Sequence, residues 1–183
     1  MTRRADLAFE EEGSAAMDIR IAGIVNDSIV DGPGIRLTIF TQGCSHKCPG
    51  CQNPQTHDFN GGELTTTEEI LAKIDGNPLL KGITLSGGEP FEQAAPLIEI
   101  VKAVKARGLD VWAYSGYLFD ELIEGKAGPL AVELLKLCDV LVDGLFVQEL
   151  KTFSAKWRGS SNQRVIDVPA SLAAGSAVDM PGM

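Results

Sequence analysis

The chain has 183 residues, of which 44% are hydrophobic and 22% charged, as in an ordinary globular protein that buries a core. Its formal net charge of −9 argues against a nucleic-acid partner, because such proteins present basic surfaces. No apolar run approaches the roughly 20 residues of a membrane-spanning helix, and the N-terminus lacks the apolar segment of a secretory signal. We therefore expect a cytoplasmic protein with no nucleic-acid and no membrane partner. In that compartment clustered cysteines bind metal more often than they form disulfides.

The chain divides into three parts by composition. Residues 1–17 are small and charged without a usable period, which predicts a disordered leader. A core domain is expected over residues 18–167. The rest, 168–183, is rich in Ala, Ser and Gly and predicts a flexible tail.

Predicted strands and helices alternate along the core domain, and the polar segment 53–64 is expected to be irregular. Apolar runs predict strands over 19–25, 35–41, 82–86, 111–114, 140–142 and 165–167. Helical periodicity and end signals predict helices over 67–74, 94–105 and 129–137. This alternation predicts an α/β fold with a mainly parallel sheet, either a barrel or an open twisted sheet. Ligands of such folds bind at the carboxyl ends of the strands.

Three cysteines in a C-x3-C-x2-C pattern, Cys44, Cys48 and Cys51, directly follow one predicted buried strand. Thiolates are soft ligands that favour zinc or iron–sulfur clusters. Three thiolates leave one iron of a four-iron cluster without a protein ligand, so a small chelating molecule can bind there. The fourth cysteine, Cys138, lies alone at an apolar helix end and is expected to be a small buried hydrophobe.

A zinc site is the alternative from a different class of protein. His46 or His57 flanks the cysteines and could complete a tetrahedral Cys3His site, which would make the chain a zinc-stabilised binding module without catalysis. Nothing in the chain supplies a second C-x2-C pair.

Other polar segments follow the predicted strands. Gly87-Gly88-Glu89-Pro90 lets a ligand approach the backbone closely, and Ser115-Gly116 and Asp143-Gly144 end two later strands. The segment 157–163, Trp-Arg-Gly-Ser-Ser-Asn-Gln, is dense in side-chain donors. It is either a surface turn or a recognition loop.

These motifs resemble a known superfamily. C-x3-C-x2-C followed by Gly-Gly-Glu-Pro resembles the radical S-adenosylmethionine enzymes, and Asp31-Gly-Pro-Gly-Ile-Arg36 resembles the activases of glycyl-radical enzymes within them. Cys48-Pro-Gly-Cys51-Gln-Asn53, Leu141-Val-Asp-Gly144 and the segment 157–163 are similar to the family that activates anaerobic ribonucleoside-triphosphate reductases. The likeness covers about Ile24 to Gln163 and implies a partial (β/α) barrel of the radical S-adenosylmethionine type.

The resemblance also implies cofactors and roles. Cys44, Cys48 and Cys51 would bind a [4Fe–4S] cluster, and the amino and carboxylate groups of S-adenosylmethionine would chelate its open iron. One electron would then cleave the S–C5′ bond, and the 5′-deoxyadenosyl radical would remove a hydrogen atom from a backbone glycine of the reductase. The residues implied in binding S-adenosylmethionine are Gly50, Cys51, Gln52, Ser86, Gly87, Gly88, Glu89, Ser115 and Asp143. Those expected to dock the partner are Asp31, Arg36, Trp157 and Arg158.

One departure concerns the methionyl carboxylate. Some activases carry Asp-x-Lys at the strand tip, where the lysine helps to bind that carboxylate, but this chain has Leu145 at the matching position. A backbone amide or Arg158 would have to replace the lysine. An activase of another glycyl-radical enzyme, such as pyruvate formate-lyase, is the nearest alternative, and a flavodoxin-like protein is the expected electron donor.

Overall fold

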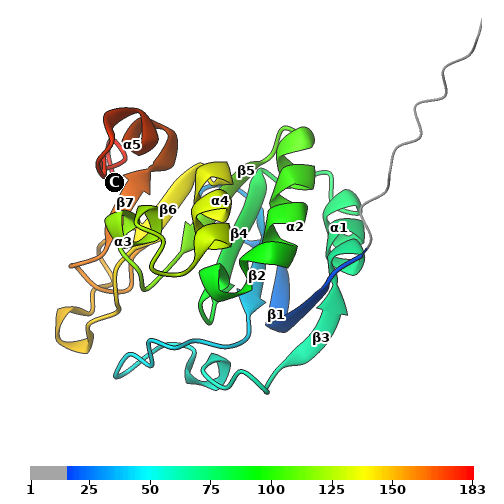
Figure 1. The fold of residues 1–183 in the computed structure, drawn as a ribbon, viewed down its shortest axis with the longest axis horizontal. Helices are drawn as coiled ribbons and strands as arrows, with labels where there is room; N and C mark the ends of the chain where they lie inside the picture. The colour runs from blue at the N-terminus through cyan, green and yellow to red at the C-terminus, as the bar shows by residue number, and fades with distance from the viewer. Residues whose placement is uncertain (1–15) are drawn as a thin grey trace, which may run out of the picture.

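A seven-stranded sheet runs through residues 16–183, the part of the chain that the computed structural model describes (Figure 1). The strand order is β3-β1-β2-β4-β5-β6-β7. The four central strands β2, β4, β5 and β6 pair in parallel, whereas β3, β1 and β7 pair antiparallel at the margins. The strands are β1 (Asp18–Ser28), β2 (Arg36–Thr41), β3 (Glu63–Thr66), β4 (Gly82–Gly87), β5 (Asp110–Tyr114), β6 (Val140–Asp143) and β7 (Arg164–Asp167).

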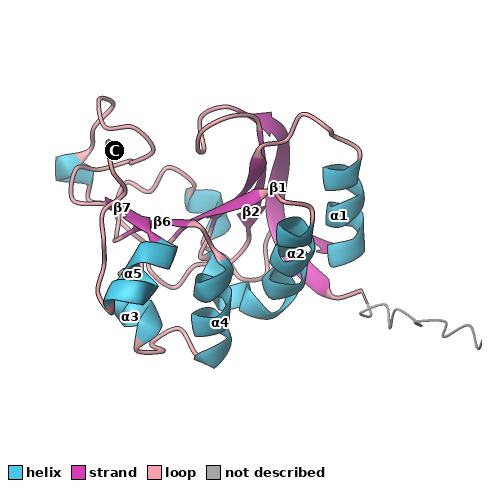
Figure 2. Ribbon diagram, turned by 90° about the horizontal axis from the view of Figure 1, so that it is seen from above, coloured by secondary structure: helices cyan, strands magenta, loops and turns pink. Residues whose placement is uncertain are grey.

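The predicted α/β class with a mostly parallel central sheet is confirmed. The helices α2, α4 and α5 lie on one side of the sheet (Figure 2). Right-handed crossovers between parallel strands require this of α2 and α4, which follow β4 and β5 in the chain. The α-helices are α1 (Thr67–Asp75), α2 (Ala94–Ala106), α3 (Phe119–Ile123), α4 (Pro129–Leu137) and α5 (Val168–Ala174). Short 3-10 helices cover Pro54–Thr56, Pro90–Gln93 and Gln148–Leu150.

The main core lies between the sheet and these helices. Buried aliphatic residues of the central strands, such as Leu37, Ile39, Ile83 and Leu85, belong to it together with the apolar residues of α2. A smaller apolar cluster consists of Trp112, Val140, Val142 and Val165, against which Tyr114, Trp157 and Met180 pack. Trp157 and Met180, from segments outside the central strands, therefore cover apolar residues of β5, β6 and β7.

The predicted strands and helices are all present, but three elements were missed. The segment 53–64 was expected to be irregular, yet its end begins β3, which pairs with Asp18–Ile21 of β1. Because β3 is a polar strand with no buried residue, it shows no alternation of apolar and polar positions. The short helix α3 was missed for lack of a full helical period.

The third missed element corrects the expectation of a flexible tail over 168–183. Helix α5 begins there, with Val168 and Ser171 fully buried and the Asp167 side chain capping the N–H of Ala170. Beyond the helix, the N–H of Met180 donates to the carbonyl of Val165 at 2.7 Å. Small residues predicted flexibility, but buried contacts and backbone pairing hold the segment against β7.

Of the predicted leader, 1–17, residues 1–15 lie outside the part of the chain that the structure describes. Met17 and Thr67 are joined by a hydrogen bond from the N–H of Thr67 to the carbonyl of Met17 at 2.9 Å. Within 16–183, no helix is long and apolar enough to cross a membrane.

Candidate active site

A cavity of about 790 Å³ lies at the carboxyl ends of the parallel strands, which is a volume typical of small-molecule sites. Every motif singled out in the sequence contributes to its wall. The lining includes Asp31, Cys44, His46, Cys48, Cys51, Gln52, Ser86, Gly87, Gly88, Glu89, Tyr114, Ser115, Gly116, Phe153, Trp157, Arg158, Gly159 and Gln163.

The three cysteines of the C-x3-C-x2-C motif face this cavity together. Cys44 is buried, whereas Cys48 and Cys51 are half-buried, and all three are free thiols. Burial raises the pKa of the Cys44 thiol and that of the Cys48 thiol, so a bound cation is needed to hold them as thiolates. The Asn53 N–H donates to the Cys51 sulfur at 3.4 Å, a contact that stabilises a metal-bound thiolate.

This donor set fits an iron–sulfur cluster. Among residues 16–183, no group of three or more His, Cys, Asp or Glu side chains is gathered closely enough to hold a single metal ion. In a four-iron cluster each thiolate binds a different iron, so the sulfur atoms lie farther apart than the ligands of a single ion. Cys44, Cys48 and Cys51 line the same cavity, and their soft sulfur donors suit such a cluster.

Backbone hydrogen bonds join the cysteine loop to the tip of β4. The N–H of Gly88 donates to the carbonyl of Thr41, and the N–H of Glu89 donates to the carbonyl of Gly43, each at 2.8 Å. A Cβ atom on Gly88 would lie 2.2 Å from the Gly43 oxygen, and one on Gly87 would lie 2.5 Å from the Thr41 nitrogen. Only glycine at both positions allows this close approach, so the motif fixes where the cysteines lie relative to β4.

The carboxylate of Glu89 connects this junction to β5. Glu89 is 1% exposed, and it accepts hydrogen bonds from the Ser115 hydroxyl, the N–H of Gly116 and the N–H of Phe91 at 2.9–3.2 Å. His46 Nε2 lies 2.9 Å from the same carboxylate. That hydrogen bond raises the pKa of His46, so the imidazole pairs with Glu89.

The second histidine, His57, also lines the cavity, and its Nε2 is buried without a partner. The zinc alternative required one of these histidines beside all three thiols. Of the two, His46 is engaged by Glu89.

Asp143 was expected to bind S-adenosylmethionine, but the structure gives it another role. Its side chain is fully buried outside the cavity wall, with one oxygen 3.0 Å from Arg164 Nε and the other 2.8 Å from the N–H of Phe119. Both oxygens are occupied in holding β7 and α3. Gly50, also expected to bind the cofactor, does not line the cavity either, because its exposed turn packs against Gln148.

Arg36 was expected to dock a partner, and this expectation is wrong because its side chain has no exposed surface. The guanidinium donates to Thr84 Oγ1 at 2.8 Å and to the carbonyl of Ile83 at 2.6 Å. It also forms an ion pair with Asp110 at 2.6 Å. Arg36 therefore fastens β2 to β4 and β5, while Asp31 of the same motif does line the cavity.

Trp157 and Arg158 also line the cavity. A Cβ atom on the intervening Gly159 would meet Gln52 of the cysteine loop at 3.2 Å, so the two loops come close there. Tyr114 and Phe153 also line the cavity, although no sequence motif pointed to them. Phe153 is 92% exposed. It stands between Thr152 and Ser154, so no apolar pattern in the sequence indicated a role for it.

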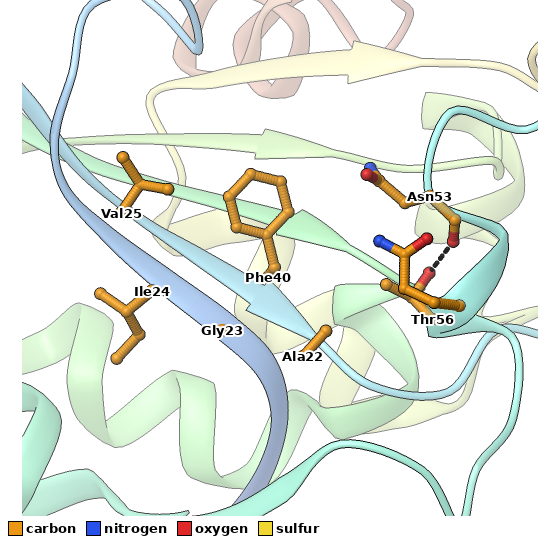
Figure 3. Close-up of a pocket in the computed structure, with 8 residues that line it drawn as sticks. Ala22, Gly23, Ile24, Val25, Phe40, Asn53 and Thr56 are labelled. Carbon is orange, nitrogen blue, oxygen red and sulfur yellow. Dashed lines mark hydrogen bonds between the residues drawn. The ribbon is translucent and has the colours of Figure 1, made fainter.

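A smaller cavity of about 260 Å³ adjoins the first along β1 (Figure 3). Phe40 points into it between Val25 and the 3-10 helix Pro54–Thr56, where Thr56 Oγ1 donates to the carbonyl of Asn53 at 2.7 Å. Val25, Phe40, Asn53 and Thr56 line both cavities. The groove thus extends the active-site cavity across the sheet towards its β1 margin.

Comparison with family models identifies the class of protein. Residues 30–166 match the family described as a 4Fe-4S single cluster domain. The match spans the cysteine loop and the whole parallel sheet. The predicted [4Fe–4S] cluster is confirmed at the level of the family.

Curated relatives narrow the class further. The chain is 41% identical to the anaerobic ribonucleoside-triphosphate reductase-activating protein of Salmonella typhi over 145 residues, covering 75% of this chain and 91% of the relative. The protein of the same name from Escherichia coli (strain K12) is 40% identical with the same coverage. That of Enterobacteria phage T4 is 37% identical, over 74% of this chain and 86% of the relative. The chain belongs to the family of anaerobic ribonucleoside-triphosphate reductase-activating proteins.

Among solved structures, the chain is similar to QueE from Escherichia coli, with a TM-score of 0.42 and 16% identity. The similarity covers 54% of this chain and 52% of that one. A likeness of this size carries no argument about the site.

Proposed function

We propose that this chain is a radical S-adenosylmethionine activase that generates a glycyl radical on an anaerobic ribonucleoside-triphosphate reductase. The observation that carries the proposal is one cavity in which three free cysteines face the Gly87–Glu89 segment and the end of β5. The names of relatives that are about 40% identical over most of the chain support it. When bound, the [4Fe–4S] cluster and S-adenosylmethionine supply the electron and the carbon radical that removes a hydrogen atom from the glycine.

The chain's own residues then bind, orient and exclude water. We propose that Cys44, Cys48 and Cys51 hold the cluster and that the backbone of Gly87 and Gly88 contacts the methionyl ammonium group. The other cavity residues predicted for this cofactor, Gln52, Ser86, Glu89 and Ser115, complete the pocket. Glu89 acts mainly through its hydrogen bonds, since four donors already surround its carboxylate.

We propose that the sheet is the partial (β/α) barrel of the radical S-adenosylmethionine type. The sheet order ends at β3 and β7, which do not pair with each other in the described residues. A partner protein would close the remaining side of the cavity, with Asp31 and Trp157 in contact with its glycine-bearing segment. Both residues line the cavity, which supports this placement.

We further propose a cytoplasmic location and a flavodoxin-like electron donor. Three free thiols that serve as ligands require a reducing compartment. The net charge of −9 supports the absence of a nucleic-acid partner.

Anaerobic reconstitution tests the proposal. About four irons per chain are expected, together with a reduced-cluster EPR signal that changes when S-adenosylmethionine is added. The reduced protein should then produce a glycyl-radical EPR signal on the anaerobic reductase and none on pyruvate formate-lyase. The reverse preference would identify the alternative activase, and a colourless protein with one tightly bound zinc would overturn the radical mechanism.

A further inference from the structure

Two neighbouring residues on the wall of the active-site cavity, Trp157 and Arg158, carry buried N–H donors without an acceptor. Among the described residues, Nε1 of Trp157 and Nε of Arg158 are buried without a hydrogen-bond partner, and both residues line the cavity. A buried donor left unpaired is costly because it has lost its hydrogen bonds to water, so native structures rarely keep one without a reason. Acceptor atoms of a bound ligand would satisfy both donors.

The guanidinium of Arg158 is anchored at one end only. Its Nη1 donates to the carbonyl of Gln163 at 3.3 Å. The Gln163 side chain accepts from the N–H groups of Gly159 and Ser160 at 2.9 and 3.1 Å, and donates to the carbonyl of Gly144 at 2.9 Å. Because this carboxamide fixes the loop, Arg158 keeps its Nε side free. A guanidinium held in this way binds a carboxylate through two parallel hydrogen bonds.

Trp157 holds its place through an unfavourable backbone conformation. Its φ of +63° is rare for a bulky residue and is energetically unfavourable. The indole packs edge-on against Trp112, with ring centroids 6.0 Å apart. Such strain persists where the surroundings over-determine it, and here it keeps the indole and the neighbouring Arg158 beside the cavity.

The charge of the cavity wall singles out one position for an anion. Among the lining residues of the described chain, Arg158 is the only lysine or arginine, whereas Asp31 and Glu89 are carboxylates. Leu145, which stands where some activases carry a lysine, is 46% exposed and does not line the cavity. An anionic group that enters this cavity therefore has one permanent cation to meet.

We propose that Arg158, assisted by the indole N–H of Trp157, binds the carboxylate of the methionyl group of S-adenosylmethionine. This assignment rests on the proposed function and takes Arg158 out of the set of partner-docking residues. Arg158 is a positioning residue in this role, because holding the carboxylate orients the methionyl group towards the cluster. It also replaces the lysine that this chain lacks at Leu145.

Binding of two ligands to cluster-loaded protein tests the proposal. The dissociation constants of S-adenosylmethionine and of its decarboxylated analogue, S-adenosylmethioninamine, are measured anaerobically by equilibrium dialysis for the wild type and Arg158→Gln. Loss of a charged hydrogen-bonded contact should weaken binding of S-adenosylmethionine about tenfold or more. Binding of the decarboxylated analogue should stay within about twofold, because it has no carboxylate to lose.

A matched control uses the neighbouring charge. Lys156 lies in the same loop but is exposed, and Lys156→Gln should leave both dissociation constants unchanged. Arg158→Lys, which keeps the charge without the planar fork, should give an intermediate loss and serves in place of Arg158→Gln if that variant does not retain its cluster.

Three outcomes would overturn the assignment. Equal weakening of both ligands would mean that Arg158 acts on the cavity in general, and unchanged binding with reduced glycyl-radical formation would return Arg158 to the partner interface. A wild type that loads its cluster but binds no S-adenosylmethionine would defeat the proposed function as well. In contrast, a wild type that binds the cofactor but activates no reductase would defeat only the proposed partner.

Discussion

His46 Nε2 lies 2.9 Å from the carboxylate of Glu89, so a residue between two of the cysteines is tied to the segment that follows β4. The same carboxylate accepts hydrogen bonds from Ser115 and Gly116 beyond β5. Three loops that are far apart in the sequence therefore share one buried anion. The carboxylate of Glu89 therefore joins the cysteine loop to the segments that follow β4 and β5.

Replacing Glu89 with Gln should destabilise the protein by about 1–3 kcal/mol, because the amide turns a donor towards N–H and O–H groups that need an acceptor. Urea denaturation of the cluster-free protein measures the effect. Glu124→Gln, at an exposed position, is the matched control and should change the free energy of unfolding by less than about 0.5 kcal/mol. Equal effects of the two substitutions would contradict the central role of Glu89.

Gly116 makes room for the His46 ring. A Cβ atom at position 116 would lie 2.4 Å from Cδ2 of His46, so Gly116→Ala should push the imidazole away from Glu89. We expect less iron per chain after reconstitution, measured by iron and sulfide analysis. Gly23→Ala is the control, since a Cβ there meets nothing within 4 Å, and it should retain the full iron content. Full iron in both variants would show that His46 does not set the position of the cysteines.

The buried contacts of Arg36 are predicted to stabilise the folded protein. Arg36→Gln leaves the Asp110 carboxylate, the Thr84 hydroxyl and the Ile83 carbonyl without their partner, so unfolding should become easier by about 3–5 kcal/mol. The exposed pair of Arg107 and Asp75 offers the comparison, and Arg107→Gln should cost about 0–1 kcal/mol. Chemical denaturation measures both. A stable Arg36→Gln protein that fails only to bind the reductase would restore the docking role.

Cys138 should be inert and dispensable for the cluster. Burial raises the pKa of its thiol to about 12, so hardly any thiolate exists at pH 8. Iodoacetamide should label Cys138 only after denaturation, whereas Cys48 and Cys51 should react in the native cluster-free protein. Peptide mass spectrometry distinguishes these sites. Cys138→Ala should also keep the iron content of the wild type, and loss of iron would show that a fourth thiol takes part.

Elements whose own residues show a clear apolar pattern were predicted correctly from the sequence. The buried runs before the cysteines and before Gly87 become parallel neighbours β2 and β4, because apolar strands joined by helical crossovers have few other arrangements. Their carboxyl ends then meet at one edge, which brings the cysteines to the Gly-Gly-Glu-Pro segment. The polar strand β3 and the helix α5 left no such pattern, since their stability comes from pairing and burial against distant residues.

The three cysteines were predicted as cluster ligands from their spacing alone, because three thiolates at this spacing have few uses other than soft-metal chemistry. Which charged residues of the motifs face the cavity depends on the fold and could not be predicted from the motifs. Asp143 and Arg36 are turned inwards onto Arg164 and Asp110, whereas Arg158 remains on the cavity wall. The physical reason is that an isolated charge is costly to bury, so its role depends on whether the fold brings it a partner of opposite charge.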